Sequence, residues 1–159
     1  MDFDENNVPE EQEDGYVEIY SKRAIFWFSV LLSPIFGGVL LAYNLKAAGY
    51  KKAVYIVGIF TVLFTAICSF AFYEYVAIYK VNLNVDFRNP NVDPHFLILN
   101  LISLGLKLAG GFIFIEYFFP KYFPEADYYP KNIFPALLVS VFVILVLGYI
   151  SALLQIRIL

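Results

Sequence analysis

The chain has 159 residues, of which 60% are apolar, 19% aromatic and 16% charged, and its mean hydropathy is +0.68. A soluble domain is nearer half apolar and a quarter charged, so this composition excludes one, and it equally excludes a disordered or disulfide-rich chain. The net charge of −3 argues against nucleic acid as a partner, and a single cysteine and a single histidine make a redox pair or a metal site improbable. The sequence therefore predicts a small all-α membrane protein with no cofactor.

The first segment, residues 1–15, differs sharply from the rest of the chain. It contains seven acidic residues and no basic one: Asp2, Asp4, Glu5, Glu10, Glu11, Glu13 and Asp14. A segment with so few large apolar side chains cannot bury enough surface to offset the entropy of ordering, so we expect a disordered acidic tail. A docking or regulatory role for this tail is the functional alternative.

Four apolar segments follow, each long enough to cross about 30 Å of hydrocarbon as a helix. They are Ala24–Tyr43, Ala53–Tyr73, Phe96–Phe119 and Phe134–Leu154. Residues 16–159 are therefore expected to form one domain, a bundle of four transmembrane helices, with both termini on the same side of the membrane. Tyrosines and phenylalanines gather at the ends of the spans, as is typical of side chains at the level of the lipid headgroups.

Small and polar side chains form a stripe along each predicted span, at the spacing of one helical face. Because lipid provides no hydrophobic drive for association, these stripes are expected to face one another and hold the helices together. Two stripes contain a double glycine, Gly37-Gly38 and Gly110-Gly111, which suggests two repeated helical hairpins. Ser33-Pro34 predicts a kink in the middle of the first span, which leaves the Val30 carbonyl without its usual donor.

Two asparagines are expected to cap helices. Asn44, at the end of the first span, is expected to cap that helix, and the alternative is a bond across to another segment. Asn132 is the expected N-cap of the fourth helix, with Pro135 in its first turn. The proline-containing segment before it, 120–133, predicts a kinked interfacial loop.

Lys107 is the candidate functional residue, because it lies near the middle of the third span. At 1.5 Å per residue it is roughly 16–18 Å from either end, and a central lysine costs about 2.5–3.5 kcal/mol on insertion scales. Either it lines a polar cavity that binds an anion or relays a proton, or it is a structural donor to the Val30 carbonyl and nearby hydroxyls. The predicted intramembrane polar site consists of Lys107, Ser103, Asn100, Ser33, Thr61, Thr65 and Ser140.

The segment between the first two spans is short and basic. Lys46, Lys51 and Lys52 are expected to contact anionic lipid or to set the topology. Under the four-span scheme basic residues divide equally between the two sides, so the short 44–52 loop alone favours the cytoplasm for its own side and the outside for both termini. The pair Lys22-Arg23 argues for the reverse orientation.

Part of the first hairpin forms a recurring pattern. The runs Tyr20-Ser21-Lys22-Arg23-Ala24-Ile25, Ser33-Pro34-Ile35-Phe36-Gly37-Gly38 and Asn44-Leu45-Lys46 resemble those of small, uncharacterised multi-spanning membrane proteins of Bacteroidota-like bacteria. The resemblance covers residues 16–55. It implies a place in a bacterial cytoplasmic membrane and supplies no catalytic residue.

No hydrolase, metalloprotease, phosphate-loop or thiol-redox motif is present in the sequence. The favoured function is accordingly non-enzymatic, a small structural, assembly or regulatory membrane protein, with membrane lipid, a protein partner of the tail or loops, or a second copy as partners. The alternative is a transport or permeation subunit centred on Lys107. A lipid-modifying enzyme that uses Glu74, His95 and Glu116 is the third hypothesis.

Overall fold

The computed structural model describes residues 17–81, 83, 93–124 and 128–158, with the backbone alone for 155–158. The predicted acidic tail, 1–15, lies outside the described residues. Within them the chain is mostly helical, and three helices are long and apolar enough to cross a membrane. These are α3 (Lys51–Tyr79), the continuous rod of α4 (Pro94–Phe112), η1 (Ile113–Phe118) and α5 (Phe119–Tyr122), and α6 (Phe134–Ile158). They contain the second, third and fourth predicted spans, which are confirmed as helices.

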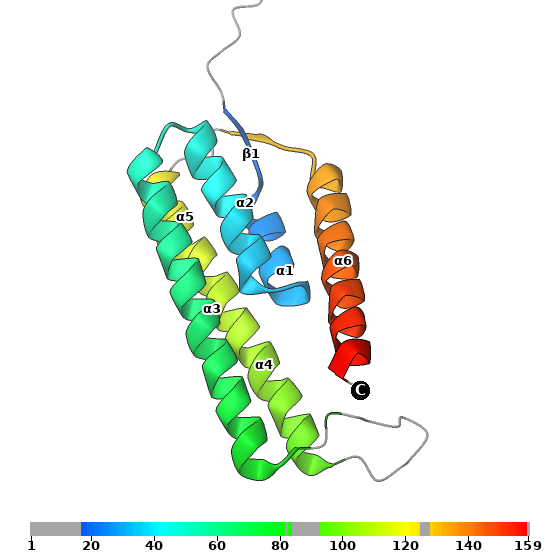
Figure 1. Cartoon of the computed structure of the whole chain (residues 1–159). Coiled ribbons are helices and arrows are strands. Elements are labelled where there is room, and N and C mark those ends of the chain that lie inside the picture. Colours follow the sequence, from blue (N-terminus) through cyan, green and yellow to red (C-terminus); the bar gives the residue numbers. More distant parts are fainter. Residues whose placement is uncertain (1–16, 82, 84–92, 125–127, 159) are drawn as a thin grey trace, which may run out of the picture.

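The expectation of a single kinked helix over Ala24–Tyr43 is wrong. This segment consists of two helices, α1 (Lys22–Leu31) and α2 (Pro34–Ala47), which pack against each other. At 1.5 Å per residue they are about 15 and 21 Å long, so neither crosses about 30 Å of hydrocarbon. They form a helical hairpin whose two ends point toward the same end of the molecule (Figure 1), and we call it the re-entrant hairpin.

The hairpin turns at Ser33-Pro34, where the sequence predicts only a kink. Proline lacks an N–H group and its ring clashes with the carbonyl four residues earlier, so α1 cannot continue through it. The amides of Leu32 and Ser33 both donate to the Phe28 carbonyl at 3.2 Å, which closes α1. Ser33 is fully extended (φ −169°, ψ 163°), and Pro34 then occupies the first turn of α2, where its missing N–H costs nothing.

The re-entrant hairpin changes the topology of the whole chain. Figure 1 shows β1 (Glu18–Ile19) and the start of α3 at the upper end of the molecule, which we call the hairpin end, and the loop from α3 to α4 at the opposite, lower end. The chain then returns upward through α4, η1 and α5, and α6 runs down to the C-terminus. The described chain therefore starts and finishes at opposite ends of the molecule, whereas the four-crossing scheme brings its two ends to the same side.

Both double glycines are points of close approach. A Cβ on Gly37 would overlap the Ser29 side chain and lie 2.8 Å from the Ile25 carbonyl oxygen, so only glycine lets α1 and α2 pack here. A Cβ on Gly111 would lie 3.3 Å from Cβ of the same Ser29, and one on Gly110 3.1 Å from Cγ of Pro34. The small residues do face one another, as predicted for these helices. The two halves of the chain are nevertheless unlike, because only the first contains a re-entrant pair.

The segment before α1 is fixed on two sides. β1 pairs in parallel with β2 (Tyr129–Pro130), and the amide of Lys131 donates to the Ile19 carbonyl at 2.9 Å. On the other side Asn44 donates to the Tyr20 carbonyl at 2.7 Å and accepts from the Tyr20 amide at 2.8 Å. The capping role expected of Asn44 is therefore wrong, and the alternative bond across to another segment is the one observed.

The hydrophobic core lies at the hairpin end. Its side chains come from β1, α1, α2, the first two turns of α3, η1 and α5, and the most deeply buried are Ile19, Ile25, Leu41, Leu45, Val57, Phe114 and Phe119. In the lower half, the side chains of α3 and α4 are mostly exposed in the isolated chain. This distribution suits helices whose lower halves meet lipid.

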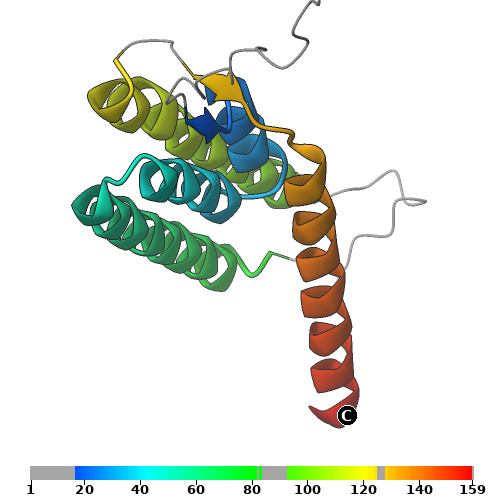
Figure 2. The ribbon, with the colours of Figure 1, turned by 90° about the horizontal axis from the view of Figure 1, so that it is seen from above.

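The fourth predicted span packs far less closely than a four-helix bundle requires. Figure 2 shows α6 running outward from the other helices. Of its residues 134–154 only Ser140 is buried, and Gly148 and Ser151, which are part of the expected stripe, are exposed. The Asn132 side chain accepts from the Phe134 amide at 2.9 Å, so its expected role as the N-cap of this helix is confirmed.

Candidate functional site

A groove lies between α3 and α4 below the tip of the re-entrant hairpin. Its volume is about 410 Å³, and Pro34, at the start of α2, is one of the residues that line it. Three predicted site residues line it: Thr65 from α3, and Ser103 and Lys107 from α4. The groove continues toward the lower end between apolar side chains, among them Phe72, Leu99, Ile102 and Leu106. The structure thus brings part of the predicted polar site together on one surface.

Lys107 is half-buried at the inner end of this groove. It lies 13 residues after Pro94 and 15 before Tyr122, hence roughly 20 Å from either end of the rod. No described residue forms a hydrogen bond or ion pair with it, so the proposed structural bond to the Val30 carbonyl is not found within the described chain. Glu116, the nearest acidic residue in sequence, lies about 13 Å further along the rod.

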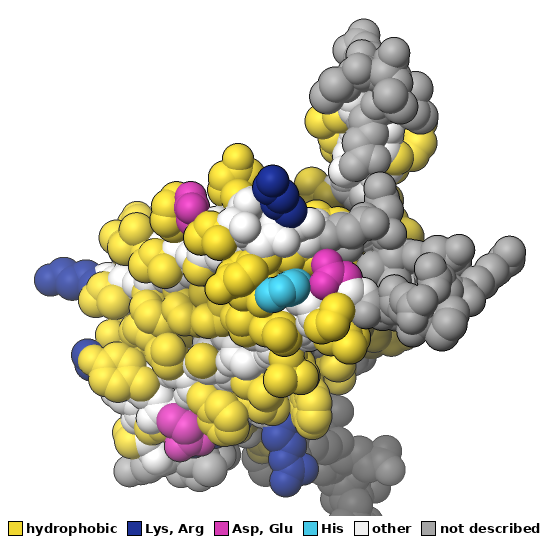
Figure 3. Space-filling view, turned by 90° about the horizontal axis from the view of Figure 1, so that it is seen from below, with side chains coloured by type: hydrophobic (Ala, Val, Ile, Leu, Met, Phe, Trp, Pro, Cys, Tyr) yellow, Lys and Arg dark blue, Asp and Glu magenta, His cyan; other side chains and the backbone are white. Residues whose placement is uncertain are grey.

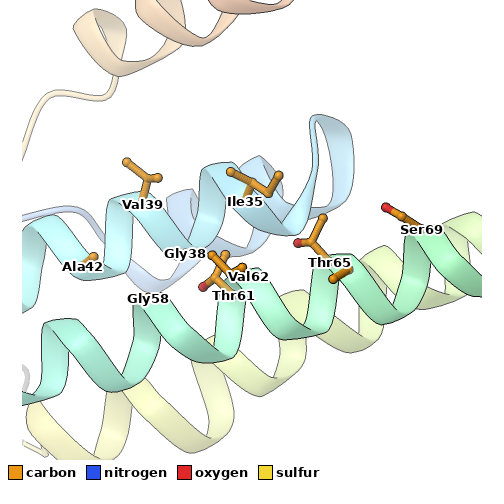
Figure 4. A pocket seen from close by; sticks show the side chains of 10 residues that line it. Ile35, Gly38, Val39, Ala42, Gly58, Thr61, Val62, Thr65 and Ser69 are labelled. Carbon is orange, nitrogen blue, oxygen red and sulfur yellow. The ribbon is translucent and has the colours of Figure 1, made fainter.

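Thr65 differs from Thr61, which lies one turn earlier on the same helix. The Thr61 hydroxyl is buried and donates to the Val57 carbonyl at 2.7 Å. The Thr65 hydroxyl oxygen is also buried, but it has no hydrogen-bond partner among the described residues. Figure 4 shows both threonines on the side of α3 that faces α2, where they line a second groove of about 420 Å³. A buried hydroxyl without a partner carries a penalty of about 1–3 kcal/mol, which a bound polar group would remove.

The other predicted site residues lie elsewhere. Asn100 is exposed, and its amide donates to the Phe96 carbonyl of its own helix at 2.8 Å. Ser140 donates to the Ala136 carbonyl and lines a separate cavity of about 530 Å³ between α2 and α6. Ser33 is half-buried beside Pro34 at the hairpin tip and forms no side-chain cap. Together with Thr61, these residues do not line the groove that contains Lys107.

The three predicted lipid-contact lysines stand at the hairpin end. Lys46, Lys51 and Lys52 are all exposed, on either side of a turn that Gly49 makes with a positive φ of 80°. None of them has a hydrogen bond or ion pair within the described chain. Their ammonium groups therefore remain available to groups outside the protein.

Other lysines at the same end are held by aromatic rings. Lys131 donates to the Tyr43 hydroxyl at 2.6 Å, and its Nζ lies 4.5 Å from the centre of that ring. This hydrogen bond raises the pKa of Lys131 above its usual value. Lys22 lies over Phe119 at 5.5 Å, and Lys121 lies between Tyr117 and Tyr122. Such pairs of rings and cations are typical of side chains at the level of the lipid headgroups.

The lower end carries a smaller cluster around His95. Its ring stacks on Tyr79 with centroids 4.7 Å apart, and Nδ1 lies 3.2 Å from the Tyr75 hydroxyl. Seen from below, this end is mostly hydrophobic, and its charged side chains are scattered (Figure 3). His95 and Glu116 are separated by about 30 Å along the rod, so the three residues of the enzyme hypothesis do not converge. The described residues contain no group of three His, Cys, Asp or Glu side chains that could hold a metal.

Two features of this region are not predicted from the sequence. One is the partner of Asn44: the sequence offers a bond across to another segment as an alternative, but nothing in it indicates the main chain of Tyr20. The other is the π-helical turn η1, which widens the rod directly after Gly110-Gly111 and buries Phe114 and Phe118 against α1 and α3. A π-turn has no reliable sequence signature, although such turns are frequent at functional sites.

No family model, curated protein or solved structure matches the chain.

Proposed function

We propose that this protein is a non-enzymatic integral membrane protein of a bacterial cytoplasmic membrane, with a structural, assembly or regulatory role at the hairpin end. The observation that supports this proposal most strongly is the gathering of the core, the aromatic rings and the exposed lysines at that one end. A preorganised, basic, aromatic surface suits contact with anionic lipid headgroups or an acidic partner.

The orientation we propose follows from the re-entrant hairpin. Because the chain returns to the side from which it started, Lys22 and Arg23 join the basic side chains at the hairpin end, which are Lys22, Arg23, Lys46, Lys51, Lys52, Lys121 and Lys131. By chain position only Lys80, Arg88 and Arg157 belong to the other side. The positive-inside rule then favours the cytoplasm for the hairpin end and for the N-terminal tail, and the outside for the C-terminus.

The lipid contact can be tested with the three exposed lysines. In nanodiscs, phosphatidylglycerol is expected to raise the melting temperature above that measured in phosphatidylcholine, and the triple variant Lys46→Gln, Lys51→Gln and Lys52→Gln is expected to lose most of that increase. Lys80→Gln, at the other end, is the matched control. An unchanged response of the triple variant would refute the proposed contact.

The acidic tail is the second part of this proposal, because in the sequence it directly precedes the segment that contains β1 at the hairpin end. Removal of residues 2–14 is expected to change the set of proteins that co-purify from the membrane in mild detergent. If the same partners are recovered in the same amounts from the truncated and the full-length chain, the tail takes no part in docking.

A permeation or transport role is the second candidate, and the groove beside Lys107 supports it. Half-helices that meet near the membrane centre, next to a polar site, are a recurring arrangement in transporters. The test is efflux of chloride and acetate from proteoliposomes that contain the full chain or Lys107→Leu. If the full chain gives no efflux above that of protein-free liposomes, or if Lys107→Leu gives equal efflux, this role is excluded for these ions.

A further inference from the structure

We propose that the groove between α3 and α4 binds a single-chain fatty acid, with its carboxylate on Lys107 and Thr65 and its alkyl chain toward the lower end. This inference is independent of the proposed role of the hairpin end, because the groove shares no residue with the exposed lysines there.

The first argument concerns charge. Lys107 has three donor hydrogens at the centre of the membrane and no acceptor among the described residues, while a central lysine costs about 2.5–3.5 kcal/mol. The described acidic side chains stand toward the ends of the helices, at Glu18, Glu74, Asp93 and Glu116. A carboxylate from a ligand would supply the missing counter-charge, and a charge-assisted hydrogen bond of this kind is worth more than a neutral one.

The second argument concerns the remaining polar atoms of the groove. The buried Thr65 hydroxyl has no partner among the described residues, and Ser103 lies one turn of α4 below Lys107 on the same groove. A carboxylate has two oxygens with about four acceptor positions, enough to accept from the ammonium group and from both hydroxyls. One carboxylate therefore has enough acceptor positions for Lys107, Thr65 and Ser103, and Ser69, which also lines the groove, lies one turn of α3 below Thr65.

The third argument concerns shape. Below Ser103 the groove is lined by apolar side chains, including Phe72, Leu99 and Ile102, down to Tyr75 near the lower end. Its volume of about 410 Å³ lies at the lower limit of typical small-ligand sites, so it suits one alkyl chain and not a two-chain phospholipid. A phosphate headgroup also belongs at the membrane surface, roughly 20 Å from Lys107. A carboxylic acid, by contrast, enters hydrocarbon in its uncharged form.

The experiment measures binding of tritiated palmitate to the full chain in nanodiscs of phosphatidylcholine. We expect saturable binding, at least tenfold weaker in Lys107→Gln and unchanged in Lys80→Gln. Hexadecanol, which has the chain but no carboxylate, is expected to compete at least tenfold less well than unlabelled palmitate. Phosphatidylglycerol added to the nanodisc is expected not to compete.

The variant Thr65→Val tests whether the Thr65 hydroxyl binds the ligand or only stabilises the fold. The substitution keeps the shape of the side chain and removes a buried hydroxyl without a partner, so the melting temperature is expected to stay the same or rise while palmitate binding weakens several-fold. The proposal is overturned by equal palmitate binding in Lys107→Gln, by hexadecanol competing as well as palmitate, or by displacement of palmitate by phosphatidylglycerol. Any of these results leaves the proposed role of the hairpin end intact.

Discussion

The Asn44 side chain forms the two main-chain hydrogen bonds with Tyr20 that a neighbouring β-strand would otherwise form. Its side-chain amide meets both the N–H and the C=O of Tyr20, so it satisfies two main-chain groups that β2 cannot reach. All of these atoms lie away from water, where an unpaired main-chain group is costly. On the side away from β2, this one side chain holds the segment before α1 in place.

Replacement of Asn44 by alanine is expected to lower the free energy of unfolding by about 2–4 kcal/mol, because two buried main-chain groups lose their partners. The matched control is Asn100→Ala, which removes an exposed bond within one helix and is expected to cost under about 0.5 kcal/mol. Unfolding in mild detergent, followed by circular dichroism against temperature or denaturant, measures both. Equal effects of the two variants would contradict the pairing of Asn44 with Tyr20.

Substitution of Lys107 is expected to have the opposite effect on stability from substitution of Asn44. Since Lys107 has no partner within the described chain, Lys107→Leu is expected to raise stability by up to about 3 kcal/mol, the cost of a lysine at the membrane centre. Thermal unfolding in detergent without added fatty acid is the measurement, and Lys46→Leu, at the exposed hairpin end, is expected to give little change. A loss of stability in Lys107→Leu would mean that Lys107 is a structural donor after all.

At the scale of the element, the re-entrant hairpin depends on a turn and on a close contact. Pro34 ends one helix and begins the next, and Gly37 allows the two helices to approach at Ser29. A two-residue turn without this approach would leave main-chain groups at mid-membrane with neither water nor protein around them, which hydrocarbon does not tolerate. The glycine is therefore as necessary to the hairpin as the proline.

Gly37→Ala is expected to destabilise the protein by about 1–3 kcal/mol, the usual cost of forcing an extra methyl group into a closely packed contact. Gly58→Ala is the control, because a Cβ there meets nothing within 4 Å and alanine is the better helix former. Unfolding in detergent measures both variants: the free energy of unfolding is expected to fall in Gly37→Ala and to stay the same or rise in Gly58→Ala. If Gly37→Ala were as harmless as Gly58→Ala, α1 and α2 would not be packed as described.

The sequence predicts the three long helices because each is an apolar run of full membrane length. It does not predict the break in the first run, because hydropathy alone cannot distinguish a crossing helix from a re-entrant pair of equal length. Lys107, Ser103 and Thr65 could be predicted from helical periodicity, since neighbouring helices keep those faces together. Periodicity wrongly places Asn100 at the site, because Leu99 is the buried residue at that turn. It also wrongly predicts packing for most of the small and polar stripe of α6, because α6 runs outward from the other helices.

For the molecule as a whole, the proposed topology depends on one feature: residues 22–47 enter and leave the membrane on the same side. The positions of the lysines, the orientation and the depth of the Lys107 groove all depend on it. A chain with four crossings would place Arg23 and Lys46 on opposite sides, and one with a re-entrant hairpin places them together. These two residues therefore distinguish the alternatives.

The most direct measurement is labelling of single cysteines with a membrane-impermeant maleimide, in a Cys68→Ala background, on spheroplasts and on inverted vesicles. We expect Arg23→Cys and Lys46→Cys to react from the same side, in inverted vesicles, and Leu83→Cys to react from the other side. Reaction of Arg23→Cys and Lys46→Cys from opposite sides would contradict the re-entrant hairpin.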